Sequence, residues 1–199
     1  MKKGTAILGL VLVVGMSAGT SLAQDTMSGN SSGKTSMSSM MNASDTDFAN
    51  MAAMGGTAEI QMADLAMQRS KSKSTLKYAK KMKKDHTKAG SDLDRVAAKK
   101  GMTLSKTPNE MQMKMMEQLK AASETEFDMM YVKVAGVEAH QAMEPLFSTE
   151  ASNGSDADLK AFAAKTLPVV QMHLRMAQDM ANGGMMSNDK KMKSDMKTN

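Results

Sequence analysis

The chain has 199 residues, which is enough for one domain with a sizeable core and two tails. Aromatic residues make up 3% of the chain and proline occurs 3 times, which argues against a β-sandwich or barrel. Cysteine is absent, so disulfides, thiolate chemistry and cysteine-ligated zinc are excluded. The formal net charge of +5 is mild and its signs are interspersed, which argues against nucleic acid as a partner.

The first 23 residues are typical of a secretory signal peptide. Lys2 and Lys3 precede an apolar run from Ala6 to Met16, and the small residues Ser21 and Ala23 come before the expected cleavage site. The alternative is a retained membrane anchor, but the run is shorter than the roughly 20 residues that span a bilayer. We therefore expect cleavage, no transmembrane segment in the mature chain, and export to the periplasm or to an outer-membrane-associated location.

Two further segments have compositions typical of disordered chain. Residues 24–45 are dominated by Ser, Gly, Asn and Thr, and residues 183–199 are similar with added Lys. Neither segment can bury enough apolar surface to offset the entropy of ordering its backbone. The folded domain is therefore expected over residues 46–182.

The hydrophobic pattern of this domain predicts an all-α protein. Apolar residues recur at spacings of three and four over about 45–70, 74–100, 124–151 and 155–182, which predicts an antiparallel four-helix bundle. A short extra helix is expected at 109–122, in the connection between the second and third long helices. Asp45 or Asp47 can cap the first helix and Ser155 the last. Pro168 is expected to kink the last helix.

The apolar stripes predict which side of each long helix faces the core. On the third helix the stripe contains Met129, Gly136, His140 and Phe147, so all four are expected to be buried. The second helix carries a face rich in lysine, which we interpret as solvated (Lys80, Lys81, Lys83, Lys84 and Lys99).

Each long helix also carries one titratable residue on its apolar stripe. These residues are Glu59 and the chain's three histidines, His86, His140 and His173. A buried charge costs several kcal/mol unless it is paired or ligated, so the pattern calls for an explanation. Glu59 and His86 are about equally far from the turn between their helices. His173, however, is expected to lie roughly 10 Å along the axis from His140, unless the kink at Pro168 or another loop register brings them together.

Two interpretations of these residues remain open. The first is a metal site in the core, formed by Glu59, His86, His140 and His173, with Asp85 as a further ligand or as a hydrogen-bond partner of a ligand. Imidazole and carboxylate groups suit Cu, Fe or Zn. The second is a packed core in which Glu59 and His86 form a buried ion pair. No histidine has a glutamate three residues before it, which argues against a carboxylate-bridged di-iron centre.

Methionine is unusually frequent, with 26 residues. Inside the domain it can serve as a flexible core filler. Outside the domain Met37, Met40 and Met41 form a cluster whose thioethers suit a soft ion such as Cu(I). Within the domain, Met111–Met116 contains a second dense group. Reversible oxidation to sulfoxide, or no role at all, are the alternatives.

A set of residues spread over the predicted helices forms a recognisable pattern: Phe48, Glu59, Ala66, Ser70, Asp85-His86, Phe127-Asp128, Tyr131, His140, Leu167-Pro168 and His173-Leu174. This pattern resembles the exported bacterial family called domain of unknown function 4142, over about residues 46–181. The resemblance implies a ferritin-like four-helix bundle, and the family's label of predicted outer membrane protein implies an envelope location. It implies no established activity.

Three functional hypotheses follow. The first is a non-enzymatic envelope protein that binds a metal ion or supports stress tolerance. The second is a metal-dependent redox enzyme, against which the missing Glu-x-x-His motif counts. The third is a structural or interaction protein with packed histidines. Hydrolase signatures such as Gly-x-Ser-x-Gly and His-Glu-x-x-His are absent from the sequence.

Overall fold

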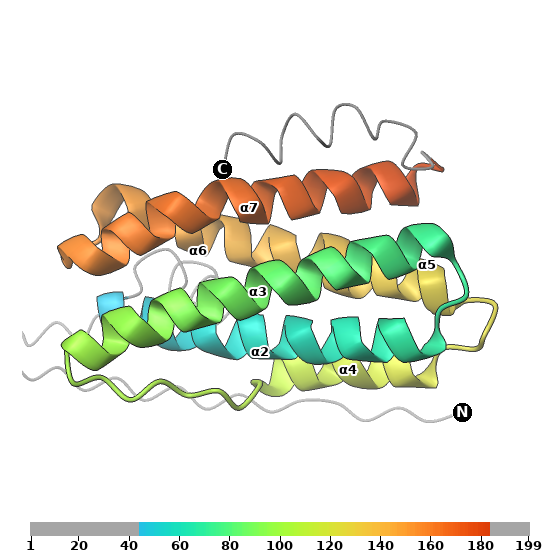
Figure 1. Ribbon diagram of the computed structural model, residues 1–199, viewed down its shortest axis with the longest axis horizontal. Helices are drawn as coiled ribbons and strands as arrows, with labels where there is room; N and C mark the ends of the chain where they lie inside the picture. Colours follow the sequence, from blue (N-terminus) through green and yellow to red (C-terminus); the bar gives the residue numbers. More distant parts are fainter. Residues whose placement is uncertain (1–43, 184–199) are drawn as a thin grey trace, which may run out of the picture. The chain divides into compact units, whose positions relative to one another are not determined.

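A computed structural model describes residues 44–183, and over this range the protein is an all-α bundle, as predicted (Figure 1). The signal-like segment, the cluster Met37, Met40 and Met41, and the C-terminal tail from residue 184 lie outside the described residues. The elements are α2 (Asp45–Arg69), α3 (Lys73–Lys99), α4 (Glu110–Ala121), α5 (Phe127–Tyr131), the π-helix η1 (Val132–Glu138), α6 (Ala139–Asn153) and α7 (Ala157–Ala181).

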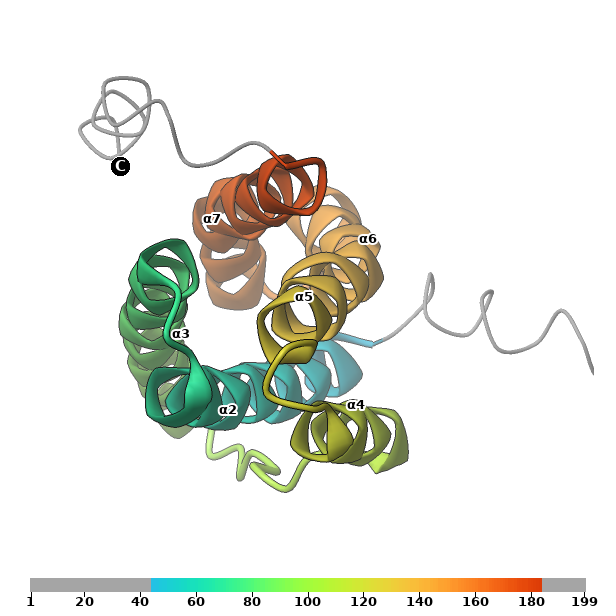
Figure 2. The same ribbon diagram turned by 90° about the vertical axis from the view of Figure 1, so that its right-hand side faces the viewer.

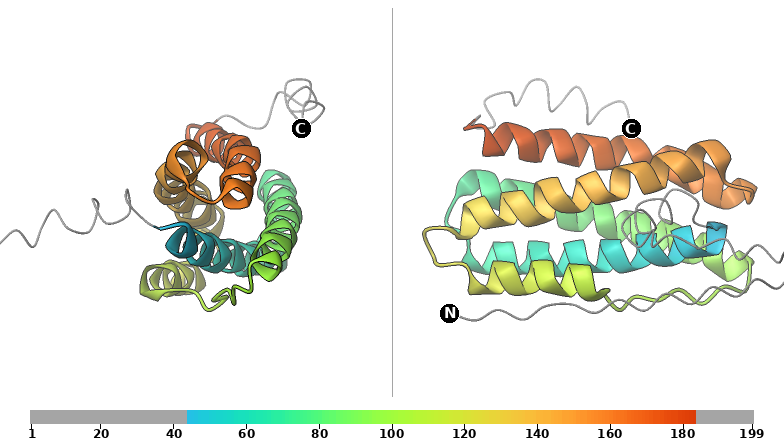
Figure 3. Two further views of the ribbon diagram at one scale, coloured as in Figure 1. Left: turned by 90° about the vertical axis from the view of Figure 1, so that its left-hand side faces the viewer. Right: turned by 180° about the vertical axis from the view of Figure 1, so that it is seen from behind.

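Four long rods surround a common interior. Helices α2 and α3 lie side by side, and the continuous rod α5–η1–α6 lies beside α7 (Figures 1 and 2). The short helix α4, predicted in the connection between the second and third rods, packs against α2 outside this group (Figures 2 and 3). Within residues 44–183, none of the helices combines the length and the apolar character that crossing a membrane requires.

The helix caps differ from those predicted. Helix α2 is capped by Ser44, whose side chain accepts from the backbone N–H of Asp47, and α7 is capped by Asp156. Asp45 instead accepts the backbone N–H groups of Ser155 and Asp156, at 2.9 and 2.7 Å. A side chain that caps a helix accepts hydrogen bonds only from the free backbone N–H groups at the start of that same helix. Asp45 satisfies free N–H groups of another helix start and so ties α2 to the turn before α7.

The third rod is not the uninterrupted α-helix that was predicted. Its π-helical segment η1 inserts one extra residue, which rotates everything before it relative to everything after it. Phe127 and Tyr131 are therefore buried, while Met129 is 71% exposed, so the prediction of a buried Met129 was wrong. Ala135 and His140, five residues apart, both lie in the core.

Gly136 in η1 lets this rod approach α7 very closely. A Cβ atom built on Gly136 would lie 2.5 Å from the Cβ of Ala177. Because the two rods run in opposite directions, this contact sets residues one turn away on each at the same level: His140 follows Gly136 by four residues, and His173 precedes Ala177 by four. The close approach therefore determines which residues of the two rods meet.

Replacing Gly136 with alanine is expected to lower the free energy of unfolding by about 1–3 kcal/mol, because the added methyl group overpacks this contact. Urea denaturation of the full chain measures it. Gly56→Ala is the matched control: a Cβ there meets nothing within 4 Å, and helical alanine is favoured over glycine by about 0.5–1 kcal/mol. Equal stability changes in the two variants would contradict the prediction.

The buried core has two parts, one at each end of the bundle. One is built around Phe48, Phe147 and Phe162, and the other around Tyr78 and Tyr131. The titratable residues of the apolar stripes lie between these two apolar clusters, so the fold holds them far from either end of the rods.

Candidate metal centre

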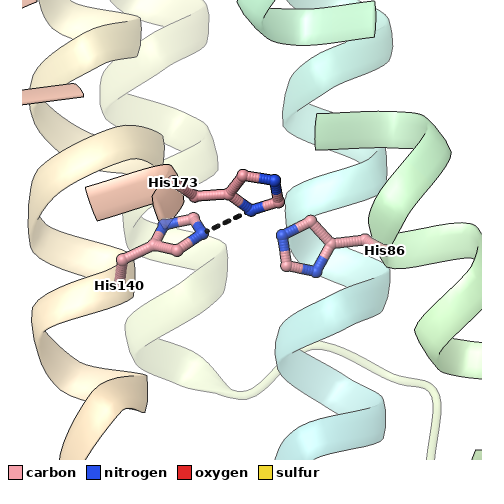
Figure 4. A group of neighbouring side chains, drawn as sticks. All are labelled: His86, His140 and His173. Carbon is pink, nitrogen blue, oxygen red and sulfur yellow. Dashed lines mark hydrogen bonds between the residues drawn. The ribbon is translucent and has the colours of Figure 1, made fainter. Parts of the chain in front are cut away.

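The three histidines meet in the middle of the bundle. His86 comes from α3, His140 from α6 and His173 from α7, and Figure 4 shows the three rings converging. Each ring offers one nitrogen, and these three nitrogens lie within 4.8 Å of one another. His140 and His173 are fully buried and His86 is nearly so.

The expected axial offset of His173 was wrong. Its Nδ1 lies 3.3 Å from Nε2 of His140. An offset of roughly 10 Å follows when both residues are counted from position 153. The chain leaves α6 at that position but enters α7 only at Ala157, and the turn between them adds no rise along the axis. The remaining offset is about three residues, and the close contact of Gly136 with Ala177 brings the two histidines to one level.

The orientation of the His140 ring is determined by the π-helix. Its Nδ1 lies 3.0 Å from the backbone oxygen of Ala135, five residues earlier. A carbonyl oxygen only accepts, so Nδ1 carries the hydrogen and donates it. Nε2 of the same ring therefore presents its lone pair to the centre of the cluster.

The His173 ring is held in the same way by a carboxylate. Its Nε2 lies 2.9 Å from Oδ2 of Asp85, and Lys81 Nζ lies 3.0 Å from that same oxygen. Burial acts to raise the pKa of Asp85, but the hydrogen bonds from His173 and Lys81 outweigh it and lower this pKa to about 2. The ionised carboxylate fixes the hydrogen on Nε2, so Nδ1 of His173 also presents a lone pair.

Lys81 therefore differs from the prediction that its side chain is simply solvated, because it pairs with Asp85. It is half-buried against Asp85, while Lys80, Lys84 and Lys99 are exposed, as predicted. The (i, i+4) spacing of Lys81 and Asp85 is visible in the sequence and could have suggested this pair.

The contact between His140 and His173 thus brings two lone pairs face to face at 3.3 Å. Burial lowers the pKa of His140 to about 3 and also lowers that of His173, so both rings are neutral near pH 7. Two neutral rings with their hydrogens directed outward cannot form a hydrogen bond with each other. A cation bound by both nitrogens turns this repulsive contact into a favourable one.

Glu59 lies behind two of the rings, away from the point where they converge. Its Oε2 is 3.2 Å from Nδ1 of His86 and its Oε1 is 3.4 Å from Nδ1 of His140. Burial raises the pKa of Glu59 to about 8, so the carboxyl group keeps its proton at neutral pH. The predicted neighbourhood of Glu59, His86 and His140 is present, with the carboxyl group on the outer side of the imidazoles.

The inner nitrogen of His86 completes the group. Its Nε2 is buried and has no hydrogen-bond partner within residues 44–183. In Figure 4 this nitrogen faces the rings of His140 and His173. Burial lowers the pKa of His86 well below its ordinary value, so this ring is also neutral.

The spacing of one pair of nitrogens in this group matches that of a tetrahedral ion. Two nitrogens at the usual metal–imidazole distance of about 2.05 Å subtend a tetrahedral angle when they are about 3.3 Å apart, which is the separation of His140 Nε2 and His173 Nδ1. His86 would supply a third nitrogen and leave a fourth position open. Asp85, Glu59 and the carbonyl of Ala135 then hold the outer nitrogens, an arrangement typical of metal-binding histidines.

Two tyrosines beside this group were not singled out as site residues from the sequence. The Tyr78 hydroxyl donates to the backbone oxygen of His173 at 3.1 Å and so supports the position of that ring. Tyr131 packs against Tyr78, and its buried hydroxyl has no hydrogen-bond partner among the described residues. Tyr131 belongs to the pattern that resembles the family, whereas Tyr78 carried no signal, because an inward tyrosine at helical spacing is usual in a core.

A family model described as "Domain of unknown function (DUF4142)" matches residues 30–180. No curated protein and no solved structure matches the chain. The matched range includes every residue of the histidine cluster and the residues that hold the rings.

Proposed function

The chain belongs to the DUF4142 family, and on this premise we propose that His86, His140 and His173 bind one transition-metal ion in an exported, cell-envelope protein. The lysines, apolar run and small residues of positions 2–23 support export. Three neutral imidazoles suit Cu, Zn or Fe, and the general affinity order places Cu above Zn and Zn above Fe.

The observation that carries this proposal is the 3.3 Å contact between His140 Nε2 and His173 Nδ1. Nδ1 of His140 donates its hydrogen to the Ala135 oxygen, and Nε2 of His173 donates its hydrogen to Asp85. The two nitrogens that face each other therefore carry no hydrogen. A core histidine that served packing alone would pair its two nitrogens with protein groups of opposite character.

The alternative is a core without metal, in which a proton held between His140 and His173 removes the repulsion. The low pKa of His140, about 3, disfavours it, because burial strongly opposes a charge on that ring. A metal ion brings its own charge and is compensated by the carboxylate of Asp85 and, once ionised, by that of Glu59.

Titration of the metal-free full chain tests the proposal. We expect one Zn²⁺ or Co²⁺ ion per chain, the visible absorption of tetrahedral Co²⁺, and a zinc-dependent rise in thermal stability. These two ions discriminate the core from the methionine cluster at Met37, Met40 and Met41, because thioethers are poor ligands for them.

The matched control changes acidic groups distant from the histidines. The double variant Asp45→Asn/Glu150→Gln, with Asp45 at the start of α2 and Glu150 near the end of α6, is expected to bind zinc as the wild type does. The double variant His86→Gln/His140→Gln is expected to lose stoichiometric binding. Unchanged zinc binding by the histidine variant, or none by the wild type, would exclude this function and leave the packed core.

A further inference from the structure

A cavity of about 360 Å³ lies between the four long rods, beside the histidine cluster. Each rod contributes buried apolar side chains to its wall, among them Ala53 from α2, Leu93 from α3, Phe147 from α6 and Val170 from α7. All four belong to the apolar cluster at one end of the bundle. The cavity is therefore a space within the hydrophobic core of that end.

One edge of this cavity faces solvent. Thr87 and Ser91 of α3 and Lys106 of the loop after α3 line it, and all three residues are exposed. A small molecule can therefore enter past α3 while the rods keep their packing.

The charged groups along the wall are already engaged with protein groups. Among the described residues that line the cavity, Lys106 is the one lysine or arginine, and its Nζ lies 2.7 Å from Oδ2 of Asp94, which lines the cavity too. The Glu59 carboxyl group contacts Nδ1 of His86 and Nδ1 of His140. The cavity therefore offers no unpaired charge to a ligand, and its attraction comes from apolar surface.

The volume sets the size of the molecule that fits. An apolar protein cavity of about 150 Å³ stays dry and binds benzene, and pockets for small organic molecules begin at about 300 Å³. A space of about 360 Å³ is more than twice as large as the benzene cavity. It suits a molecule of two fused rings.

The side chains around this space favour an aromatic molecule. Phe147 and Phe162 both line the cavity, with their ring centroids 6.1 Å apart and their planes inclined by 48°. Aromatic rings attract one another in tilted and edge-on arrangements, beyond the effect of the area they bury. Met143 also lines the cavity, and its thioether makes favourable contacts with aromatic rings.

Two helical glycines keep the space open. Gly56 in α2 and Gly90 in α3 line the cavity, and a Cβ built on either meets nothing within 4 Å. Their φ angles are not in the left-handed region, so the backbone does not require glycine at either position. Alanine would stabilise both helices. The two glycines therefore sacrifice helix stability at the wall of the cavity.

We propose that the cavity binds one neutral aromatic molecule of about two fused rings. The rings lie among the side chains of Phe147, Phe162 and Met143. This site is separate from the proposed metal function, because no part of the ligand needs the ion.

The test uses 1-fluoronaphthalene and the full chain prepared without metal, followed by fluorine NMR. We expect saturable binding of one molecule per chain, at least tenfold tighter than that of fluorobenzene or of 4-fluoro-1-naphthoate. Fluorobenzene fills only part of the space. The naphthoate has the same rings, but its carboxylate loses water and gains no partner. Equal affinity for 1-fluoronaphthalene and either of the other two compounds would overturn the proposal.

Variants that fill the cavity provide the second measurement. Gly56→Leu and Gly90→Leu come from two different rods, and leucine is a better helix former than glycine. Each is expected to weaken the binding of 1-fluoronaphthalene at least tenfold. Ala98→Leu, at an exposed position of α3, is the control and should leave the affinity unchanged. Binding that survives both glycine variants would overturn the cavity as the site.

The cavity and the metal site fail in different ways. The zinc-loaded chain is expected to bind 1-fluoronaphthalene as tightly as the metal-free chain does, and binding that requires zinc would overturn the apolar basis of the cavity. A chain that binds zinc but not 1-fluoronaphthalene overturns this inference alone. A chain that binds 1-fluoronaphthalene but not zinc overturns the metal function alone.

Discussion

Replacing His140 with glutamine is expected to lower the affinity for zinc at least a thousandfold. His140 supplies one of the two nitrogens that already stand at the tetrahedral spacing, and its ring is held by the Ala135 carbonyl, so no neighbouring group can take its place. At a zinc concentration 1,000 times the wild-type dissociation constant, binding stabilises the fold by about 4 kcal/mol. The variant is expected to lose nearly all of this increment.

The metal-free variant separates a ligand from a packing residue. His140→Gln is expected to change the free energy of unfolding without metal by no more than about 1 kcal/mol, because it also removes the opposed lone pairs. Calorimetric unfolding with and without zinc measures both quantities. A variant that is strongly destabilised without metal, yet gains as much from zinc as the wild type, would show that His140 serves packing.

Asp85 is expected to act as a positioning residue within the same experiment. Asp85→Asn keeps an oxygen that can accept from His173 but removes the charge, and loss of such a partner typically lowers metal affinity 10- to 100-fold. The Co²⁺ spectrum should keep its tetrahedral form, because the ligands are unchanged. Asp64→Asn, which breaks the more exposed pair with Lys83, is the matched control and should leave the affinity unaltered.

Zinc affinity is expected to rise about tenfold per pH unit between pH 6.5 and 8, and to level off above the pKa of Glu59, which is about 8. Below this pKa the Glu59 carboxyl group holds a proton that His86 Nδ1 can accept in a hydrogen bond, and Nε2 then carries the ring hydrogen. Metal binding needs the lone pair of Nε2, so the ring hydrogen moves to Nδ1, and the charge of the bound ion then favours release of the Glu59 proton, because the carboxylate accepts the hydrogen bond from Nδ1. The lowered pKa values of the three rings leave the histidines neutral in this interval.

Calorimetry in two buffers of different ionisation enthalpy counts this proton. We expect about one proton released per zinc ion at pH 7 in the wild type. In Glu59→Gln we expect almost none, and a nearly flat affinity from pH 6.5 to 8. A wild type that releases no proton, or a Glu59→Gln variant with an unchanged pH dependence, would contradict this coupling.

Local patterns in the sequence were sufficient for the number and approximate limits of the long rods and for the inward direction of the histidines, although they did not predict the π-helix in the third rod. The three- and four-residue spacing predicts the long helices and the short α4, because residues at this spacing share one face of a single helix. His140 and His173 lie on the predicted inner faces for the same reason. The composition also excluded disulfides and a β-rich fold before any geometry was known.

Only the tertiary structure decided which of these groups meet. The position of His173 along the bundle axis, relative to His140, depends on the length of the turn before α7 and on the close contact of Gly136 with Ala177. Neither follows from the periodicity of one helix. The π-helix that exposes Met129 and turns His140 toward Ala135 lies where this rod packs against α7, and the periodicity of one helix does not predict it. One helix determines the direction of a side chain, whereas the distance between two nitrogens depends on how the rods are placed.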